Sequence, residues 1–101
     1  MHKIKIDPTG ILTLSGEATF STTPELYKEG CHLINTHDHL TFDLQGITSS
    51  DNSGAALLTA WVRHAKMQDK TIAFTNPPPQ LLQILKLTGL QHILPITINE
   101  H

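Results

Sequence analysis

The sequence has few of the features that indicate an oxidising compartment, a membrane span or nucleic-acid binding. Its single cysteine, Cys31, cannot form an internal disulfide, so we expect a reducing, cytosolic environment. No apolar run reaches the roughly 20 residues of a membrane span, and the first residues alternate like a strand, which is unlike a signal peptide. Seven Lys and Arg against nine Asp and Glu give a net charge of −2 without a basic block, which argues against nucleic-acid binding.

Motifs of enzymatic chemistry are equally scarce. The sequence has no nucleophile elbow, no glycine-rich phosphate loop and no pair of carboxylates at a catalytic spacing. Cys31 lies in the middle of a predicted helix, away from the N-terminal dipole that would lower the pKa of its thiol. We interpret Cys31 as a small buried hydrophobe. We therefore expect a protein that is not an enzyme and that needs no cofactor.

Histidine, by contrast, is abundant, with seven residues in 101. His37, Asp38 and His39 place three potential metal ligands together, and alternate residues of a strand share a face, so both rings could point one way. A metal site needs three or four converging ligands, and the sequence has neither a CxxC nor an HExxH motif. We interpret the cluster as a solvated loop before a strand and predict no metal site. A histidine-based metal-binding module is the weakest alternative.

Strand and helix patterns alternate along the chain and predict one α/β domain over residues 1–101. A hairpin at the N-terminus followed by helix–strand units favours a mixed sheet of four to five strands with helices packed on it. Pro95 interrupts the last strand, which we therefore place at an edge. The expected strands are residues 1–7, 11–18, 39–44, 71–75 and 93–98.

Three helices are expected, over residues 22–35, 52–68 and 78–88. Thr22 and Glu25 form a capping box at the start of the first helix, and Gly89 follows the third as its C′ residue. We expect a polar loop over residues 45–52 before the second helix. That helix has the clearest apolar stripe, formed by Gly54, Leu57, Leu58, Trp61, Val62 and Ala65.

The third helix carries more apolar residues than one buried face can hold. Two interpretations are open: some of the leucines form an exposed partner surface, or the helix is wedged between the sheet and the second helix. The residues concerned are Leu81, Leu82, Ile84, Leu85, Leu87 and Leu90.

The start of the second helix is the candidate functional site. Three side chains before Gly54 are able to cap the helix, those of Ser50, Asp51 and Ser53. Gly54 itself permits close approach of backbone or partner. The segment is either a well-capped helix start or a place where exposed N–H groups and a small hydroxyl receive a partner or a phosphate. The predicted partner-binding residues are Ser50, Asp51, Asn52, Ser53 and Gly54.

Over nearly its whole length the chain resembles a STAS domain, the fold shared by anti-sigma factor antagonists, sulfate-transporter tails and the MlaB subunit of bacterial phospholipid transporters. The most specific part is Asp51-Asn52-Ser53-Gly54, which corresponds to the family's Asp-Ser/Thr-Ser/Thr/Ala-Gly element except at Asn52, which departs from its second position. The remaining matches are Leu14-Ser15-Gly16-Glu17, Phe42-Asp43-Leu44, Ala55-Ala56-Leu57-Leu58, Thr71-Ile72-Ala73-Phe74 and Leu87-Thr88-Gly89-Leu90.

Among STAS domains the chain is most similar to the MlaB group, because its leucine-rich third helix is followed by Leu94-Pro95. This resemblance implies a non-enzymatic subunit that docks on the cytoplasmic ATPase of an ABC-type phospholipid transporter and stabilises its active form. It implies a cytoplasmic location, peripheral at the inner membrane through that partner. Asn52 stands where MlaB-like proteins typically have a threonine that matters for the ATPase.

The resemblance also implies an alternative. In anti-sigma factor antagonists a partner kinase phosphorylates the serine directly before the glycine, and Ser53 occupies that place. The chain would then be a signalling switch whose partners are an anti-sigma factor and a serine kinase.

Overall fold

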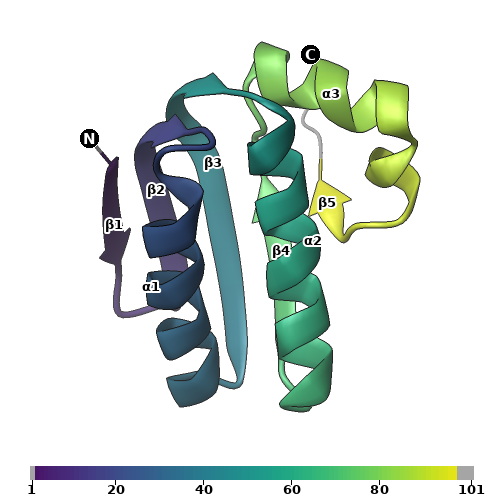
Figure 1. The fold of residues 1–101 in the computed structure, drawn as a ribbon. Coiled ribbons are helices and arrows are strands. Elements are labelled where there is room, and N and C mark those ends of the chain that lie inside the picture. Colours follow the sequence, from purple (N-terminus) through teal and green to yellow (C-terminus); the bar gives the residue numbers. More distant parts are fainter. Residues whose placement is uncertain (1, 98–101) are drawn as a thin grey trace.

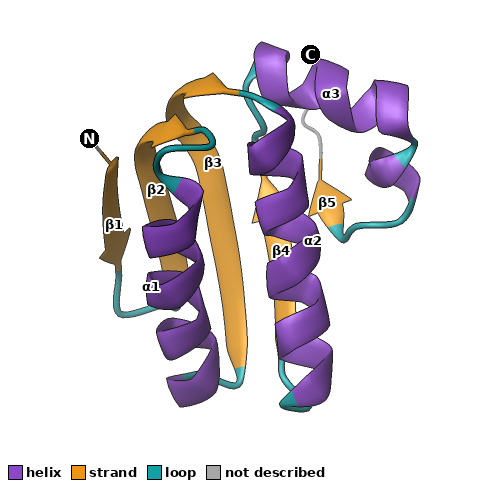
Figure 2. Ribbon diagram, in the orientation of Figure 1, coloured by secondary structure: helices purple, strands orange, loops and turns teal. Residues whose placement is uncertain are grey.

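The computed structural model describes residues 2–97, which form one five-stranded sheet with three α-helices (Figures 1 and 2). None of the helices in this part of the chain has the length and apolar run that crossing a membrane requires. In chain order the elements are β1 (His2–Ile6), β2 (Ile11–Ala18), α1 (Thr23–Thr36), β3 (His39–Ser50), α2 (Asn52–Met67), β4 (Thr71–Thr75), α3 (Pro79–Thr88), the 3-10 helix η1 (Leu90–His92) and β5 (Ile96–Thr97).

The sheet has the simple strand order β1-β2-β3-β4-β5. β1 pairs antiparallel with β2, and the other three pairs are parallel, which confirms the predicted mixed sheet. Each parallel connection moves one strand in the same direction, and such crossovers are right-handed. Figure 1 accordingly shows α1 and α2 side by side on one face of the sheet, while α3 lies across its end, near β5.

Trp61 lies at the centre of the core and joins both helices to the sheet. Its side chain is fully buried, its ring centroid lies 4.6 Å from that of Phe42, and its Nε1–H donates to the Tyr27 carbonyl oxygen at 3.3 Å. A Cβ on Gly30 would lie 2.3 Å from the indole, so glycine is what lets α1 pack this close. The apolar stripe of α2 is confirmed, since Leu57, Leu58 and Trp61 are all buried.

The prediction of a polar loop over residues 45–52 is wrong, because β3 continues to Ser50. Its last residues pair with the end of β2, and two register shifts interrupt this ladder. Each irregularity adds a residue and breaks the two-residue alternation. The buried side chains after Leu44 are therefore Ile47 and Ser50, three residues apart, and this part of the strand does not show the pattern of one.

The prediction of a capping box at the start of the first helix is also wrong. Thr22 is the N-cap residue, but its side chain makes no capping hydrogen bond. The Thr22 hydroxyl instead accepts from the Thr19 N–H at 3.0 Å and donates to the Glu17 carbonyl oxygen at 2.8 Å. It therefore holds the loop between β2 and α1 in place.

The last strand lies at the edge of the sheet, as predicted, but it is shorter than expected. Residues Leu90–His92 form η1, and β5 is only Ile96–Thr97; Ile98 lies outside the described residues. Pro95 directly precedes β5, and its carbonyl oxygen accepts from the Phe74 N–H at 2.9 Å. Since proline has no N–H to donate, Pro95 pairs with β4 only through this carbonyl oxygen, which fits its place on an edge strand.

Each of the two interpretations of the third helix holds for part of it. Leu81 and Leu85 are buried against the core, and the side chains of Leu82 and Ile84 are half-buried. Leu87, by contrast, is 80% exposed. α3 is thus mainly a wedged helix with one leucine left at the surface.

Candidate functional site

The candidate site lies where the parallel strands end, at the start of α2. The loops that follow β2, β3 and β4 gather there, because the carboxyl ends of parallel strands lie at the same end of a sheet. Two hydrogen bonds tie them together: the Phe20 N–H donates to Asp51 Oδ2 at 3.1 Å, and the Ser50 N–H donates to Gln80 Oε1 at 2.9 Å. We call residues Ser50–Gly54 the β3–α2 junction.

Asp51 caps α2. Its Oδ1 accepts from the Ser53 N–H at 2.8 Å, which satisfies one of the N–H groups that have no partner within the helix. Burial alone would raise the pKa of Asp51, but the N–H groups of Phe20 and Ser53 favour the charged form, and the net shift lowers it. The carboxylate is therefore charged at neutral pH and links the start of α2 to the loop after β2.

The five predicted junction residues differ in their access to solvent. Asn52 is exposed and Ser53 and Asp51 are half-buried, whereas Ser50 and Gly54 are buried. A Cβ on Gly54 would lie 2.7 Å from Ser50 Oγ and 3.0 Å from the Ala18 carbonyl oxygen. Ser50 and Gly54 thus support the junction from behind, and Asn52 and Ser53 form its surface.

A shallow groove of about 350 Å³ runs beside Ser53, between the first halves of α1 and α2. On the α2 side its walls are Ala56 and Ala60, whose small side chains leave the space open. Tyr27 forms the wall on the α1 side. A hydrogen bond with the Cys31 thiol raises the pKa of Tyr27, so its phenol is uncharged at neutral pH. The residues that line it are Thr23, Pro24, Tyr27, Ser53, Ala56, Leu57 and Ala60.

Phe20 is the feature of the site that the sequence analysis missed. Its side chain is 80% exposed, although large aromatic side chains are usually buried. Asp51 holds its backbone from one side, and the Thr22 hydroxyl holds the neighbouring Thr19 from the other. A single aromatic residue inside a run of threonines and serines, directly before a helix, was the available signal.

Cys31 is half-buried and packs against the core. Burial raises the pKa of its thiol, and a hydrogen bond with Tyr27 opposes that shift only in part. A thiol with a raised pKa carries little thiolate at neutral pH and is a poor nucleophile. Cys31 was interpreted as a small buried hydrophobe, and the structure places it half-buried at the margin of the core.

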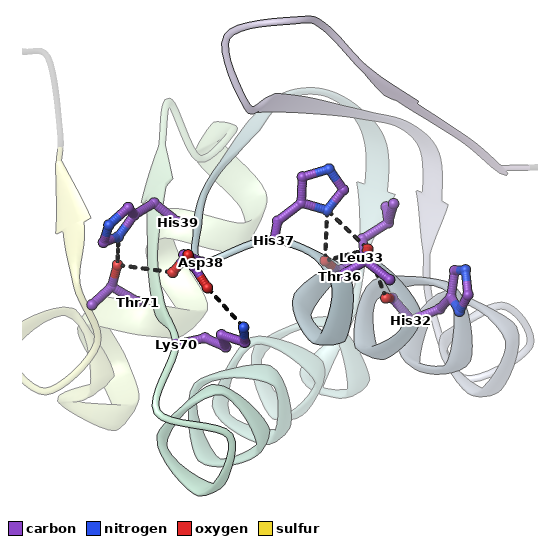
Figure 3. Close-up of polar contacts among 8 residues, drawn as sticks. All are labelled: His32, Leu33, Thr36, His37, Asp38, His39, Lys70 and Thr71. Carbon is purple, nitrogen blue, oxygen red and sulfur yellow. Dashed lines mark hydrogen bonds and ion pairs between the residues drawn. The ribbon is translucent and has the colours of Figure 1, made fainter.

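The histidine cluster lies at the other end of the sheet, and its two rings point to different neighbours (Figure 3). His37 is the C-cap of α1 and is not part of β3, and its Nδ1 lies 2.9 Å from the Leu33 carbonyl oxygen. His39 begins β3, and its Nδ1 pairs with the hydroxyl of Thr71. The shared face that strand alternation could have given both rings does not form, because His37 lies outside the strand. Within residues 2–97, no three potential metal ligands come together.

The model of one protein family, described as Mlab, STAS domain, matches residues 4–95. Among curated proteins, no sequence matches the chain. Several solved structures share the fold. An anti-sigma factor antagonist from Mycobacterium paratuberculosis has a TM-score of 0.80 and 20% identity, over 95% of this chain and 85% of that one.

Two further structures agree. A putative anti-sigma factor antagonist from Thermotoga maritima has a TM-score of 0.77 and 17% identity, over 99% of this chain and 87% of that one. The anti-sigma factor antagonist SpoIIAA in its unphosphorylated form has a TM-score of 0.74 and 10% identity, over 100% and 90% of the two chains. At these identities the likeness establishes the common fold.

Proposed function

The chain belongs to the STAS domain family, of the Mlab type, and from this premise we propose that it is a binding subunit of an ABC-type phospholipid transporter. In this proposal it is not an enzyme. It docks on the cytoplasmic ATPase subunit through the β3–α2 junction and stabilises the active form of that subunit. It needs no cofactor, and it reaches the inner membrane only through its partner.

The observation that carries the proposal is the surface formed around Ser53. The junction offers Asn52 and Ser53 at the start of α2, with the exposed ring of Phe20 and the groove bounded by Tyr27 beside them. Aromatic side chains next to a small concave surface are typical centres of protein–protein interfaces. The hydrogen bonds of Asp51 fix these parts relative to one another before a partner arrives, which lowers the entropic cost of binding.

A charge placed on Ser53 tests the proposal. In Ser53→Glu the new carboxylate lies near the positive end of the α2 dipole but also near the charged Asp51, so we expect stability to stay within about 0.5 kcal/mol. In the complex the same charge has to be desolvated against a surface that fits a neutral hydroxyl. We therefore expect the affinity for the ATPase to fall by roughly 2 kcal/mol, or about 30-fold.

The measurement is a calorimetric titration of the purified ATPase subunit of the transporter with each variant, with thermal melts of each variant alone. Gln68→Glu is the matched control, because Gln68 is exposed, follows the far end of α2 and gains the same charge. Equal affinities of wild type and Ser53→Glu at equal stability would remove Ser53 from the interface. A large fall in stability would mean that the junction serves only as a helix cap.

The alternative function is an anti-sigma factor antagonist controlled by phosphorylation at Ser53. The observation that favours it is the position of Ser53, half-buried in the first turn of α2 and directly before Gly54. A phosphate there would be stabilised by the N-terminal end of the helix. Incubation with a serine kinase encoded beside this chain, followed by mass spectrometry of Ser53, distinguishes the two functions, because only the alternative predicts stoichiometric phosphorylation.

A further inference from the structure

A second concave surface lies at the opposite end of α2 from the junction. It is a cavity of about 350 Å³ between the last turns of α2, the start of β4 and the segment that joins η1 to β5. This volume lies within the range of small-molecule sites, about 300–1,000 Å³. None of its lining residues belongs to the β3–α2 junction or to the groove beside Ser53.

The inner part of this cavity is apolar. Ala65 and Leu94 are almost completely buried and form its floor, and Ile93, which is 74% exposed, stands at its lip. An isoleucine held this far out of the core gains little from folding, but it would bury apolar area against a ligand in the cavity. The apolar lining residues are Val62, Ala65, Ile72, Ile93, Leu94 and Pro95.

The polar part of the lining carries positive charge. Lys66 comes from the last turn of α2, and Lys70 comes from the turn before β4. The Lys70 ammonium donates to Asp38 Oδ1 at 2.8 Å, as Figure 3 shows. An ammonium group has three N–H donors, so Lys70 can keep this bond and still donate to a second acceptor. Among the residues that the structure describes, the lining itself includes these two lysines and no acidic residue.

We propose that this cavity binds a single-chain amphipathic carboxylate, with the acyl chain on the apolar floor and the carboxylate between Lys66 and Lys70. An uncharged chain of the same length would fill the floor but would offer no negative charge to the two ammonium groups. A cationic amphiphile would meet both lysines with the same sign and be repelled. This inference is independent of the proposed docking function, because the two sites share no residue.

The test uses decanoate as the probe, below its micelle concentration, with methyl NMR spectra of the whole chain. We expect saturable shifts of the methyl groups of Val62, Ile72 and Leu94. Decanol should bind at least tenfold more weakly, and decyltrimethylammonium should produce no saturable shift. Shifts that do not saturate, or saturable shifts confined to the groove beside Ser53, would overturn the proposal.

Two charge variants test the role of the lysines. Lys66→Glu should weaken decanoate binding at least tenfold, with only a small fall in melting temperature, because Lys66 is exposed but lies in the last turn of α2, where the helix dipole favours a positive charge. The matched control is Lys86→Glu, an exposed lysine of α3 outside the cavity, which should bind decanoate like wild type. Equal affinities of Lys66→Glu and Lys86→Glu, or of decanoate and decanol, would refute the carboxylate site.

Discussion

Replacing Gly30 by alanine tests how closely α1 and α2 must pack. In an ordinary mid-helix position this substitution stabilises a protein by about 1 kcal/mol. In α1, however, the new Cβ would lie 2.3 Å from Cε2 and Nε1 of Trp61, whose side chain is fully buried. The indole is an inflexible neighbour, packed against Phe42 with a centroid separation of 4.6 Å. Either the helix or the ring has to move.

The magnitude follows from three contributions. Overpacking of a core costs about 1–3 kcal/mol. A shift of the indole also breaks the 3.3 Å hydrogen bond from Trp61 Nε1–H to the Tyr27 carbonyl oxygen, and a buried donor without a partner costs about 1–3 kcal/mol. After subtracting the gain of about 1 kcal/mol in helix propensity, we expect Gly30→Ala to lose about 3 kcal/mol of unfolding free energy.

Urea unfolding followed by circular dichroism measures this loss, with Lys28→Ala, an exposed position of the same helix, as the control. A double-mutant cycle with Trp61→Phe isolates the contact, since the smaller ring lacks the atoms nearest the new methyl group. In the Trp61→Phe background the cost of Gly30→Ala should shrink by 1 kcal/mol or more, roughly the coupling typical of contacting residues. A Gly30→Ala variant as stable as wild type, or more stable, would refute the close packing of the two helices.

Three further predictions concern the core and the junction. Trp61→Ala should cost about 3–5 kcal/mol in urea unfolding, and a loss under about 1 kcal/mol would show that Trp61 is not a core residue. The fold lowers the pKa of Asp51 below its unfolded-state value of 3.8. The charged carboxylate therefore contributes its full stabilisation at pH values above 3.8, and this contribution is lost as the pH falls through the lower folded-state pKa. Melts of Asp51→Asn down to about pH 2 should therefore show a flatter loss of stability in acid than wild type, and parallel curves would contradict this linkage. Gln80→Ala should cost about 1–3 kcal/mol of unfolding free energy, because the buried Ser50 N–H loses its acceptor. Gln80→Glu keeps an oxygen at that place and should cost less. Equal losses of the two variants in urea unfolding would exclude the hydrogen bond.

The elements that could be predicted from the sequence are those in which one periodicity holds from end to end. β2 and β4 have the predicted bounds, Ile11–Ala18 and Thr71–Thr75. α2 matches within one residue, because its apolar side chains recur at 3.6-residue spacing along the whole helix. The prediction for β3 ended too early, because its pairing with β2 shifts register twice. Ile47 therefore leaves the alternation that starts at Leu40, and the buried residues after Leu44 recur every three positions instead of every two.

The candidate site also has features that local sequence predicts and features that it does not. Local sequence predicted a capped helix start, with Ser50, Asp51 and Ser53 all able to serve as the N-cap residue, and the structure shows that Asp51 does so. The bond from the Phe20 N–H to Asp51 joins residues 31 positions apart, and no local pattern predicts such a contact. The groove between Tyr27 and Ala56 likewise exists only because two helices lie side by side.

What brings these residues together is the parallel pairing of β2, β3 and β4. In a hairpin, consecutive loops alternate between the two ends of the sheet, whereas a helical crossover returns the chain so that each parallel strand ends at the same side. Phe20 follows β2, Asp51 follows β3 and Gln80 lies a few residues after β4, so the three meet once those strands are parallel. Binding sites of open α/β sheets lie at these carboxyl ends for the same reason. Strand direction therefore determines the position of the junction. The strand patterns alone do not specify this direction, but the helices predicted between the strands indicated that the strands are parallel.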